Sequence, residues 1–404
     1  MKNYEGDWIG LGKVLLPKGL FNFGLRPNNT QSVLLAQTHA SFSMAVEPLA
    51  RGQAPSMLKN DETPAGPGIN VWIETRGGTP QQVFARVSEW VDRRVVFVRQ
   101  EQIADHLFLH GQTTQQGADD GSISEITRHT DFRIDHYVLR LPDGNHLVVR
   151  ASREIAMNAE LKARRERDAK DTERNSPGYM NFDQDSLDAE SRYQAWRDKL
   201  NPLLEAALPL VMANIRVFQG DPAKLPLPAK GMARHYLWNC AFDYPMDKLA
   251  INGARIFAEV DFGTAGRAVW LFEDVRVTHE DGRPVNMRLL DAAIEKNTAG
   301  LWQEKREQKA FDPEFEEIKA RPMRVGGHEG VFSEFYLPAN RIADDTLADR
   351  NYAHYAVLTY ADGQQWVSNA ELTRAQMRMF RASAMRSNYL DLFLAQIRVT
   401  GLPS

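Results

Sequence analysis

One β-hairpin pattern that occurs twice constrains the fold of this chain more than any other feature of its sequence. The first copy spans residues 136–150, where two alternating apolar segments flank a Pro-Asp-Gly turn. Asp-Gly between alternating apolar residues is a strong short-range signal for an antiparallel pair of strands. The second copy spans residues 354–367, opens with the same His-Tyr pair and turns at Asp362-Gly363. Each half of the chain is therefore expected to contain the same hairpin.

A second, shorter match follows each hairpin in the same order. The sequence reads Ala-Asn-Ile-Arg-Val at residues 213–217 and Ala-Gln-Ile-Arg-Val at residues 395–399. Two matches in one order predict an internal duplication. Each half also reads as strands, one helix, further strands and a closing helix. We therefore expect an α+β fold with two tandem, duplicated domains, each an antiparallel sheet packed against helices.

The length of 404 residues fits two domains of about 150 to 200 residues each. A Pro-rich segment at residues 219–230 reads as a semi-rigid linker between them. The predicted organisation is an N-terminal α+β domain at residues 1–218, this linker, and a C-terminal α+β domain at residues 231–404. A charged stretch near residues 155–190 predicts a helical insertion in the first domain.

Composition excludes several classes of protein. The net charge of −4 offers no basic excess for a phosphate backbone, so nucleic acid is not expected as a partner. The single cysteine, Cys240, excludes an internal disulfide and a cysteine-based zinc site, and its apolar neighbours predict a buried small side chain. No apolar run reaches the roughly 18 residues of a membrane span, so no transmembrane segment is expected.

The start of the sequence bears on the compartment. Residues 1–8 contain no apolar signal region and no lipid-accepting cysteine. We therefore expect a periplasmic protein if an export signal has been removed, and a cytoplasmic protein otherwise.

Local patterns in the first half predict strands and a capped helix. Residues 8–16 and residues 235–241 each read as one strand. Thr79-Pro80 predicts the start of a helix, because Thr is a good N-cap and Pro is tolerated at the first helical position. Val83 and Val87 give that helix an apolar face.

A longer helical pattern precedes the predicted linker. Residues 187–215 carry apolar side chains along one face at helical spacing. Pro202 and Pro209 interrupt this pattern, so we expect a kink or a break. A last helix is expected over residues 373–395.

Catalytic signatures are scarce in this sequence. No nucleophile elbow, His-Glu-x-x-His or phosphate-binding glycine loop occurs. His106 and His110 have a metal-like spacing, but on a strand they lie roughly 13 Å apart, too far to bind one ion. We interpret both as structural histidines and expect no metal site, no cofactor and no catalytic residue. An alternative hypothesis places His106, His129 and Asp131 in the active site of a hydrolase between the two domains.

Two loops of the second half are candidate binding sites. Residues 326–330, Gly-Gly-His-Glu-Gly, predict a tight turn with a polar tip, and loops on a rigid scaffold commonly carry binding residues. Residues 343–349 are acidic and could present negative charge to a partner. The candidate partner-binding residues are His328, Glu329, Glu334, Asp344 and Asp345.

The second half resembles a known family. Its Gly327-His328-Glu329-Gly330 segment leads into a strand that carries Glu334, a helix follows Leu372, and Arg288-Leu289-Leu290 lies upstream in a helical run. These features are similar to the C-terminal domain of immunity proteins that neutralise type VI secretion lipase effectors.

The first half resembles the same family through residues 10–19, which look like its opening strand. Phe332 stands where the family has a glutamate, and the family's early cysteine is missing. The resemblance implies two α/β domains and a non-enzymatic periplasmic inhibitor that keeps the active site of a secreted lipase toxin closed. It also implies that this toxin is the partner. The chain is then expected to be a monomer, or to form a heterodimer with the toxin. An effector chaperone or adaptor, which would stay cytoplasmic, is the other binding hypothesis.

Overall fold

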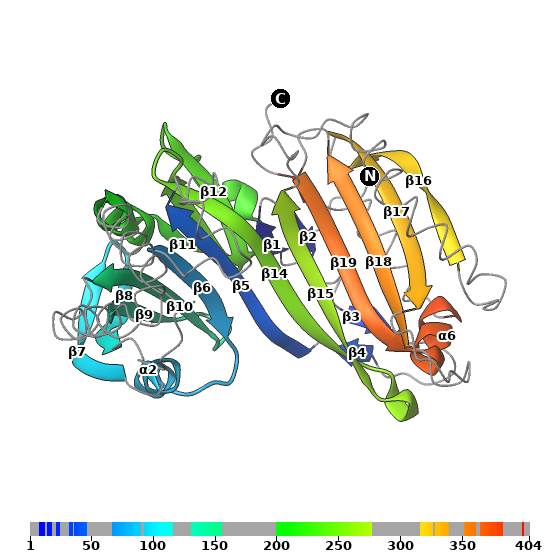
Figure 1. Cartoon of the computed structure of the whole chain (residues 1–404), viewed down its shortest axis with the longest axis horizontal. Coiled ribbons are helices and arrows are strands. Elements are labelled where there is room, and N and C mark those ends of the chain that lie inside the picture. The colour runs from blue at the N-terminus through cyan, green and yellow to red at the C-terminus, as the bar shows by residue number, and fades with distance from the viewer. Residues whose placement is uncertain are drawn as a thin grey trace, which may run out of the picture.

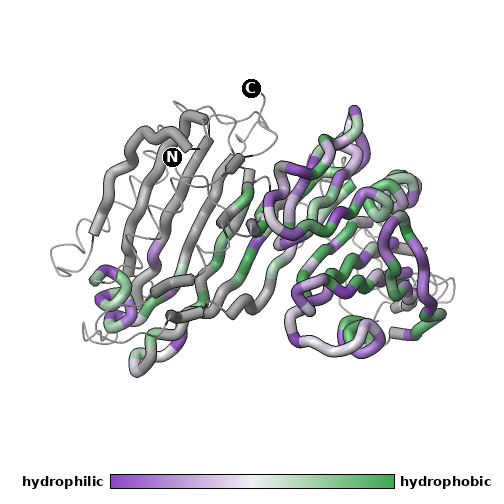
Figure 2. The backbone as a smooth tube through the Cα atoms, turned by 180° about the vertical axis from the view of Figure 1, so that it is seen from behind, coloured by the Kyte–Doolittle hydropathy of each residue, from purple (hydrophilic) through white to green (hydrophobic). Residues whose placement is uncertain are grey.

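The computed structural model describes the chain in blocks, and most of these residues lie in antiparallel sheets with few helices (Figure 1). The blocks are residues 8–12, 14–17, 22–24, 32–34, 36–46, 67–89, 93–115, 131–155, 199–276, 316–325, 328–338, 351–360, 364–382 and 398–399. In the part of the chain that Figure 2 colours, both hydrophobic and hydrophilic residues occur along the strands, as expected for sheets with one buried face.

Twelve strands form one sheet that runs through both halves of the chain. In spatial order they are β16 (Glu316–Val325), β17 (His328–Pro338), β18 (Asn351–Tyr360), β19 (Gln364–Thr373), β15 (Arg267–Arg276), β14 (Leu249–Asp261), β5 (Ala36–Val46), β6 (Gly68–Glu74), β10 (His146–Ile155), β9 (Asp131–Arg140), β8 (His106–Gln115) and β7 (Arg93–Ile103). Every neighbouring pair in this sheet is antiparallel.

The other strands form a six-stranded sheet and a two-stranded sheet. The six-stranded sheet has the order β11 (Ile215–Val217), β13 (Cys240–Pro245), β12 (Met232–Trp238), β1 (Trp8–Gly12), β2 (Val14–Pro17) and β20 (Arg398–Val399). β3 (Asn22–Gly24) pairs with β4 (Ser32–Leu34). The described helices are α2 (Pro80–Ser88), residues 199–213, α6 (Arg374–Ala382) and the short 3₁₀ helices η4 (Pro222–Lys224) and η5 (Gly263–Ala265).

The pair β5–β14 joins the two halves of the twelve-stranded sheet. Outward from this pair the strand order is the same on both sides, β6-β10-β9-β8-β7 on one and β15-β19-β18-β17-β16 on the other. Strand pairing thus connects residues on either side of the predicted linker at 219–230, which here contains η4. The division of the chain into two domains at this linker stays a prediction.

The six-stranded sheet packs on the twelve-stranded sheet around Phe42 of β5. The centre of the Phe42 ring lies 4.8 Å from that of His235 on β12 and 5.0 Å from that of Phe242 on β13. Ile9 and Leu11 of β1 belong to the same buried cluster. Burying a side chain of this size contributes about 1.5–3 kcal/mol. The seam between the two halves is therefore covered by apolar side chains.

Both predicted hairpins are confirmed. β9 and β10 pair from His146↔Arg140 outward, and β18 and β19 pair through partners such as Tyr355↔Asn369. In the first turn the Asp143 carboxylate accepts a hydrogen bond from the Asn145 amide at 3.1 Å. Gly144 has φ = +87°, a conformation that costs glycine little. The turn predicted from the Pro-Asp-Gly sequence is therefore confirmed.

Two segments that were predicted as single strands are hairpins, so these predictions were wrong. Residues 8–16 form β1 and β2, with Leu11 paired to Val14. Gly12 has φ = +67°, which lets the chain reverse there. Residues 235–241 divide into β12 and β13, and Trp238 in their turn has φ = +55°. Each turn contains a single polar residue, Lys13 or Asn239, among apolar neighbours, so periodicity alone did not mark the turns.

The predicted break at Pro202 and Pro209 was also wrong within the described part of that helix. Residues 199–213 are helical through both prolines. Both prolines lie on the exposed side, while Leu204 and Leu208 are buried against the sheet. No helix of the described residues is long and apolar enough to cross a membrane. The rest of the predicted 187–215 helix lies outside the described residues.

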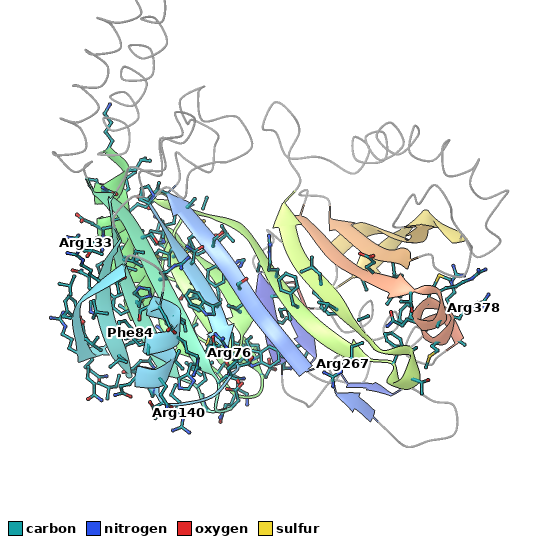
Figure 3. All side chains as sticks on the ribbon, turned by 60° about the horizontal axis from the view of Figure 1, so that its bottom comes forward. Arg76, Phe84, Arg133, Arg140, Arg267 and Arg378 are labelled. Atoms are coloured by element: carbon teal, nitrogen blue, oxygen red, sulfur yellow. The ribbon has the colours of Figure 1, made fainter. Side chains whose placement is uncertain are left out.

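Helix α2 covers one face of β8 and β9, as its sequence predicted. Thr79 is its N-cap, and the Thr79 hydroxyl and the Gln82 side chain form a reciprocal capping box. Phe84 points from α2 onto the sheet (Figure 3) and contacts the backbone of β8 at Gly111. A Cβ atom at Gly111 would lie 2.2 Å from Cε2 of Phe84, so only glycine lets the helix come this close.

We expect Gly111→Ala to lower the free energy of unfolding by about 1–3 kcal/mol, because the new methyl group overpacks against the Phe84 ring. Denaturant unfolding would measure this. Phe84→Leu in the same background is the control, since a smaller side chain should recover part of the loss. An unchanged stability of Gly111→Ala, or an equal loss in both backgrounds, would contradict the contact.

Candidate functional site

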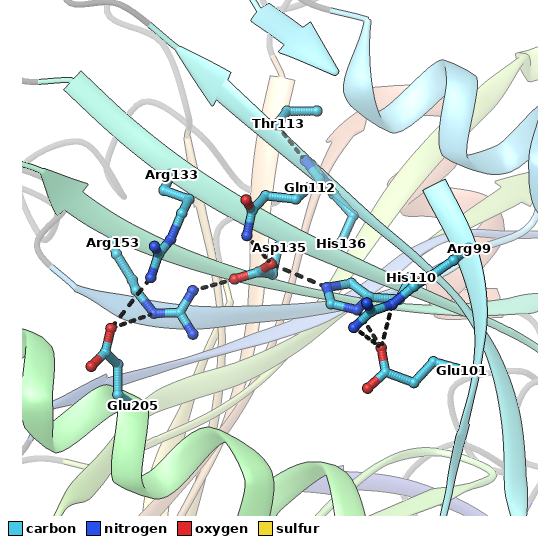
Figure 4. Close-up of polar contacts among 10 residues, drawn as sticks. All are labelled: Arg99, Glu101, His110, Gln112, Thr113, Arg133, Asp135, His136, Arg153 and Glu205. Atoms are coloured by element: carbon cyan, nitrogen blue, oxygen red, sulfur yellow. Dashed lines mark hydrogen bonds and ion pairs between the residues drawn. The ribbon is translucent and has the colours of Figure 1, made fainter. Parts of the chain in front are cut away.

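A chain of charged side chains crosses four neighbouring strands on the face opposite α2 (Figure 4). At its centre His110 of β8 contacts two carboxylates. Its Nδ1 lies 2.5 Å from Oε2 of Glu101 on β7, and its Nε2 lies 3.1 Å from Oδ1 of Asp135 on β9. Both ring nitrogens of His110 are thus in contact with carboxylate oxygens.

Asp135 continues this network across the sheet. It accepts hydrogen bonds from Gln112 at 2.9 Å and from the Arg153 guanidinium of β10. Burial opposes ionisation of this carboxyl and would raise its pKa, but the bonds from His110, Gln112 and Arg153 outweigh burial and hold the pKa well below its usual range. Arg153 then reaches Glu205 of the 199–213 helix at 3.6 Å. The network thus connects edge strand β7 to three more strands and a helix.

His110 also contacts aromatic rings. Its ring stacks on Tyr137 with centres 4.1 Å apart and meets the edge of Phe97 at 5.0 Å. Both ring nitrogens contact carboxylates, and only 6% of the residue is exposed. The structural role of His110 stays a prediction, with which these contacts agree; within the described residues, no group of three His, Cys, Asp or Glu side chains could hold a metal ion.

The residues of the hydrolase hypothesis do not come together. His106 donates a hydrogen bond from Nε2 to the Ile215 carbonyl at 3.2 Å. Asp131 begins β9, which pairs with the far end of β8, so about 10 residues, or roughly 33 Å of strand, separate it from His106. His129 lies outside the described residues. Cys240 is buried as predicted, and burial, with Asp143 nearby, raises the pKa of its thiol.

The predicted partner-binding residues lie in or beyond the β16–β17 hairpin. Val325 pairs with His328 and Arg324 with Glu329, so His328 and Glu329 belong to strand β17. Gly326 and Gly327 lie outside the described residues. Glu334 lies opposite Ala356 of β18. Asp344 and Asp345 lie outside the described residues, and nothing here tests any of the five as contacts.

An exposed apolar strip at the opposite end of the sheet was not predicted. Its members, here called the β7 strip, are Val95 (55% exposed), Val96 (56%), Val98 (43%) and, from β8, Leu107 (53%). Val95 pairs with Thr113 and Val98 with Gly111, so both lie on the face that α2 covers elsewhere. β7 is an edge strand that pairs only with β8 among the described strands. Its run of valines had predicted a strand but no function.

A groove of about 340 Å³ adjoins this strip. Leu107, Leu109 and Pro80 contribute apolar walls, and His106 and Arg140 also line it. Arg140 is exposed at one end of β9, with Arg133 at the other end (Figure 3). Such a groove is large enough for one apolar side chain but lacks convergent catalytic groups.

Two exposed cations accompany the β7 strip. Arg94 of β7 and Arg140 make no ion pair with any residue that the structure describes. Arg99 lies on the other face, and its guanidinium pairs with Glu101 at 3.2 Å. The β7 edge therefore combines exposed aliphatic side chains, unpaired backbone groups and unneutralised positive charge, which are features of a protein-binding surface.

No protein-family model and no curated protein matches the chain. Among solved structures, the apo form of immunity protein TplEi of the T6SS from Pseudomonas aeruginosa aligns at 11% identity and a TM-score of 0.40, covering 98% of each chain. The same protein complexed with an "L" peptide gives 11% and 0.39, covering 98% of this chain and 99% of that one. The di-domain ARO/CYC StfQ from the steffimycin biosynthetic pathway gives 11% and 0.12, covering 88% and 96%. Scores of this size carry no argument about this chain.

Asp135→Asn is expected to lower the free energy of unfolding by about 3–5 kcal/mol near neutral pH, because it removes the buried carboxylate that Arg153 and His110 share. The folded pKa of Asp135 lies below the unfolded value of about 3.9, so its stabilisation is complete above about pH 5 and is lost as the pH falls through the folded pKa. Urea unfolding would measure this. The difference in the free energy of unfolding between the wild type and Asp135→Asn should become smaller below about pH 4.

Glu205→Gln is the matched control on the same network. Its carboxylate is 52% exposed, so its loss should cost at most about 1 kcal/mol. The structural role given to the network would be contradicted if Asp135→Asn lost as little free energy of unfolding as the control. A difference between Asp135→Asn and wild type that grows in acid would also contradict it.

Proposed function

We propose that this chain is a non-enzymatic binding protein, an immunity protein that inhibits a secreted type VI lipase effector by steric occlusion. One observation carries the binding role: the β7 strip exposes aliphatic side chains along the edge of the twelve-stranded sheet. Native proteins usually protect such an edge with charge, proline or a covering element, because it can pair with another chain. The effector class comes from the resemblance of residues 327–334 and their surroundings to such immunity proteins.

The contacts of the histidines favour binding over hydrolysis. His110 and Asp135 are saturated by structural partners, and His106 bonds to a main-chain carbonyl. A general base needs a free acceptor within reach of the substrate proton. The described part of the first half thus offers an interaction surface rather than a catalytic arrangement.

The proposed interface also involves the second half of the chain. We propose His328, Glu329, Glu334, Asp344 and Asp345 as contacts there. A stable complex buries on the order of 1,600 Å². Twelve strands spaced about 4.8 Å apart place β7 and β16 roughly 50 Å from one another across the sheet. A partner that touches both ends would be held across a broad surface, which suits occlusion of a large effector.

A duplication is proposed as the origin of the two halves, each forming an α+β domain. Three features support it: the common strand order on both sides of β5–β14, the two matching hairpins, and the related sequences at 213–217 and 395–399. These last two segments supply β11 and β20, the two outer strands of the six-stranded sheet. Periplasmic location is proposed as part of the inhibitor function, whereas a chaperone would act in the cytoplasm.

Co-expression with the product of the adjacent gene tests the proposed function. We expect a stable complex in which the lipase activity of that product is lost, because the partner is occluded. Titration of the purified chain against lipase activity would measure this, with heat-unfolded chain as control. A complex with full activity would favour the chaperone hypothesis, and the absence of a complex would contradict both.

A further inference from the structure

We propose that the β7 edge binds an extended segment of the partner as an added antiparallel or parallel strand, and that this segment is aliphatic in its centre and acidic at the end that meets Arg94. This inference rests on the proposed binding function and specifies where and how the partner is recognised. Recognition by strand addition draws affinity from main-chain hydrogen bonds and specificity from alternate side chains.

The backbone of β7 is suited to this pairing. It has 11 residues, and its register with β8 is regular from Phe97 to Ile103. A bulge between Val95 and Phe97 interrupts the register near the other end. Among the described residues its outer edge has no neighbouring strand, so these main-chain groups are open to a partner. From Arg94 to Gln102 the strand spans about 8 residues, or roughly 27 Å.

The position of β7 is fixed before any partner binds. Glu101 is bonded to His110, and His110 to Asp135, so the inner face of the edge strand is attached to the sheet through buried charges. Phe97 packs on His110 from the same face. A rigid template loses little conformational entropy on binding, which is an advantage for a strand that must accept another.

The side chains of the β7 strip define the centre of the bound segment. Val95 and Val98 lie on the α2 face, where alternate aliphatic residues of an added strand would cover them. Leu107 continues the strip into the groove of about 340 Å³, which can take one larger apolar side chain. Covering these four exposed residues would remove an aliphatic surface that the chain otherwise presents to water.

Charge defines one end of the bound segment. Arg94 lies at that end of the strip and makes no ion pair within the described residues, so it is available to a carboxylate of the partner. At the other end, Arg140 and Asp105 both line the groove beside Leu107, so the charge there is mixed. An Arg–carboxylate pair can form two parallel hydrogen bonds, which would also fix the register of the added strand.

The test uses the full chain and the product of the adjacent gene, with binding measured by calorimetry. We expect Val98→Lys and Leu107→Lys each to weaken binding about tenfold or more, because each places a charge where apolar contact is made. Val269→Lys is the matched control, since Val269 is equally exposed (52%) but lies on β15. Its affinity should stay within about twofold of wild type.

Charge reversal tests the acidic end of the segment. Arg94→Glu should weaken binding about fivefold at low salt, mainly through slower association, with Lys230→Glu as control. Circular dichroism and thermal unfolding establish that each variant is folded.

The outcomes separate this inference from the proposed function. A complex that forms with unchanged affinity in Val98→Lys, Leu107→Lys and Arg94→Glu overturns the inference while the binding function stands. The absence of any complex overturns both. A dimer of the chain alone that Val98→Lys abolishes would show that a second copy occupies the edge, and it would also overturn the inference.

Discussion

The pairing of β5 with β14 is the constraint on which the rest of this structure depends. It joins residues that are more than 200 positions apart and makes one twelve-stranded sheet of both halves. Phe42 of β5 packs on Phe242 of β13 directly behind this seam. Because the seam is paired in the backbone and covered by apolar rings, each half holds the other in position. A broad binding surface that includes both ends of the sheet requires the two halves to be joined in this way.

In the first half, the two faces of the sheet carry different interactions: apolar packing on the α2 face and a charged network on the opposite face. On one face Phe84 of α2 contacts Gly111, and the helix leaves the outermost strand uncovered. On the other face the His110 and Asp135 contacts attach that strand to its neighbours. The same arrangement therefore exposes the valines of β7 and keeps their backbone in place. The His110 and Asp135 contacts thus hold the backbone that the proposed recognition surface would use.

Local features of this fold could be predicted from the sequence, and non-local ones could not. Asp143-Gly144 and Thr79-Pro80 carry their turn and capping chemistry within a few residues, and both elements formed as predicted. The sequence near β5 or β14 does not indicate that these two strands pair, because the paired residues lie more than 200 positions apart. The network of His110 was missed for the same reason, since its members come from four strands and a helix. Exposed valines in β7 look in sequence like those of any buried strand.

Hydrogen–deuterium exchange of the chain alone and with its partner tests the central claim most directly. The main-chain amides of β7 should exchange more slowly in the complex, because an added strand bonds to its outer edge. β16 forms the other edge of the described twelve-stranded sheet and serves as the internal reference. Protection of β7 beyond that of β16 is the predicted result. Unchanged exchange in β7 within a stable complex would contradict the account.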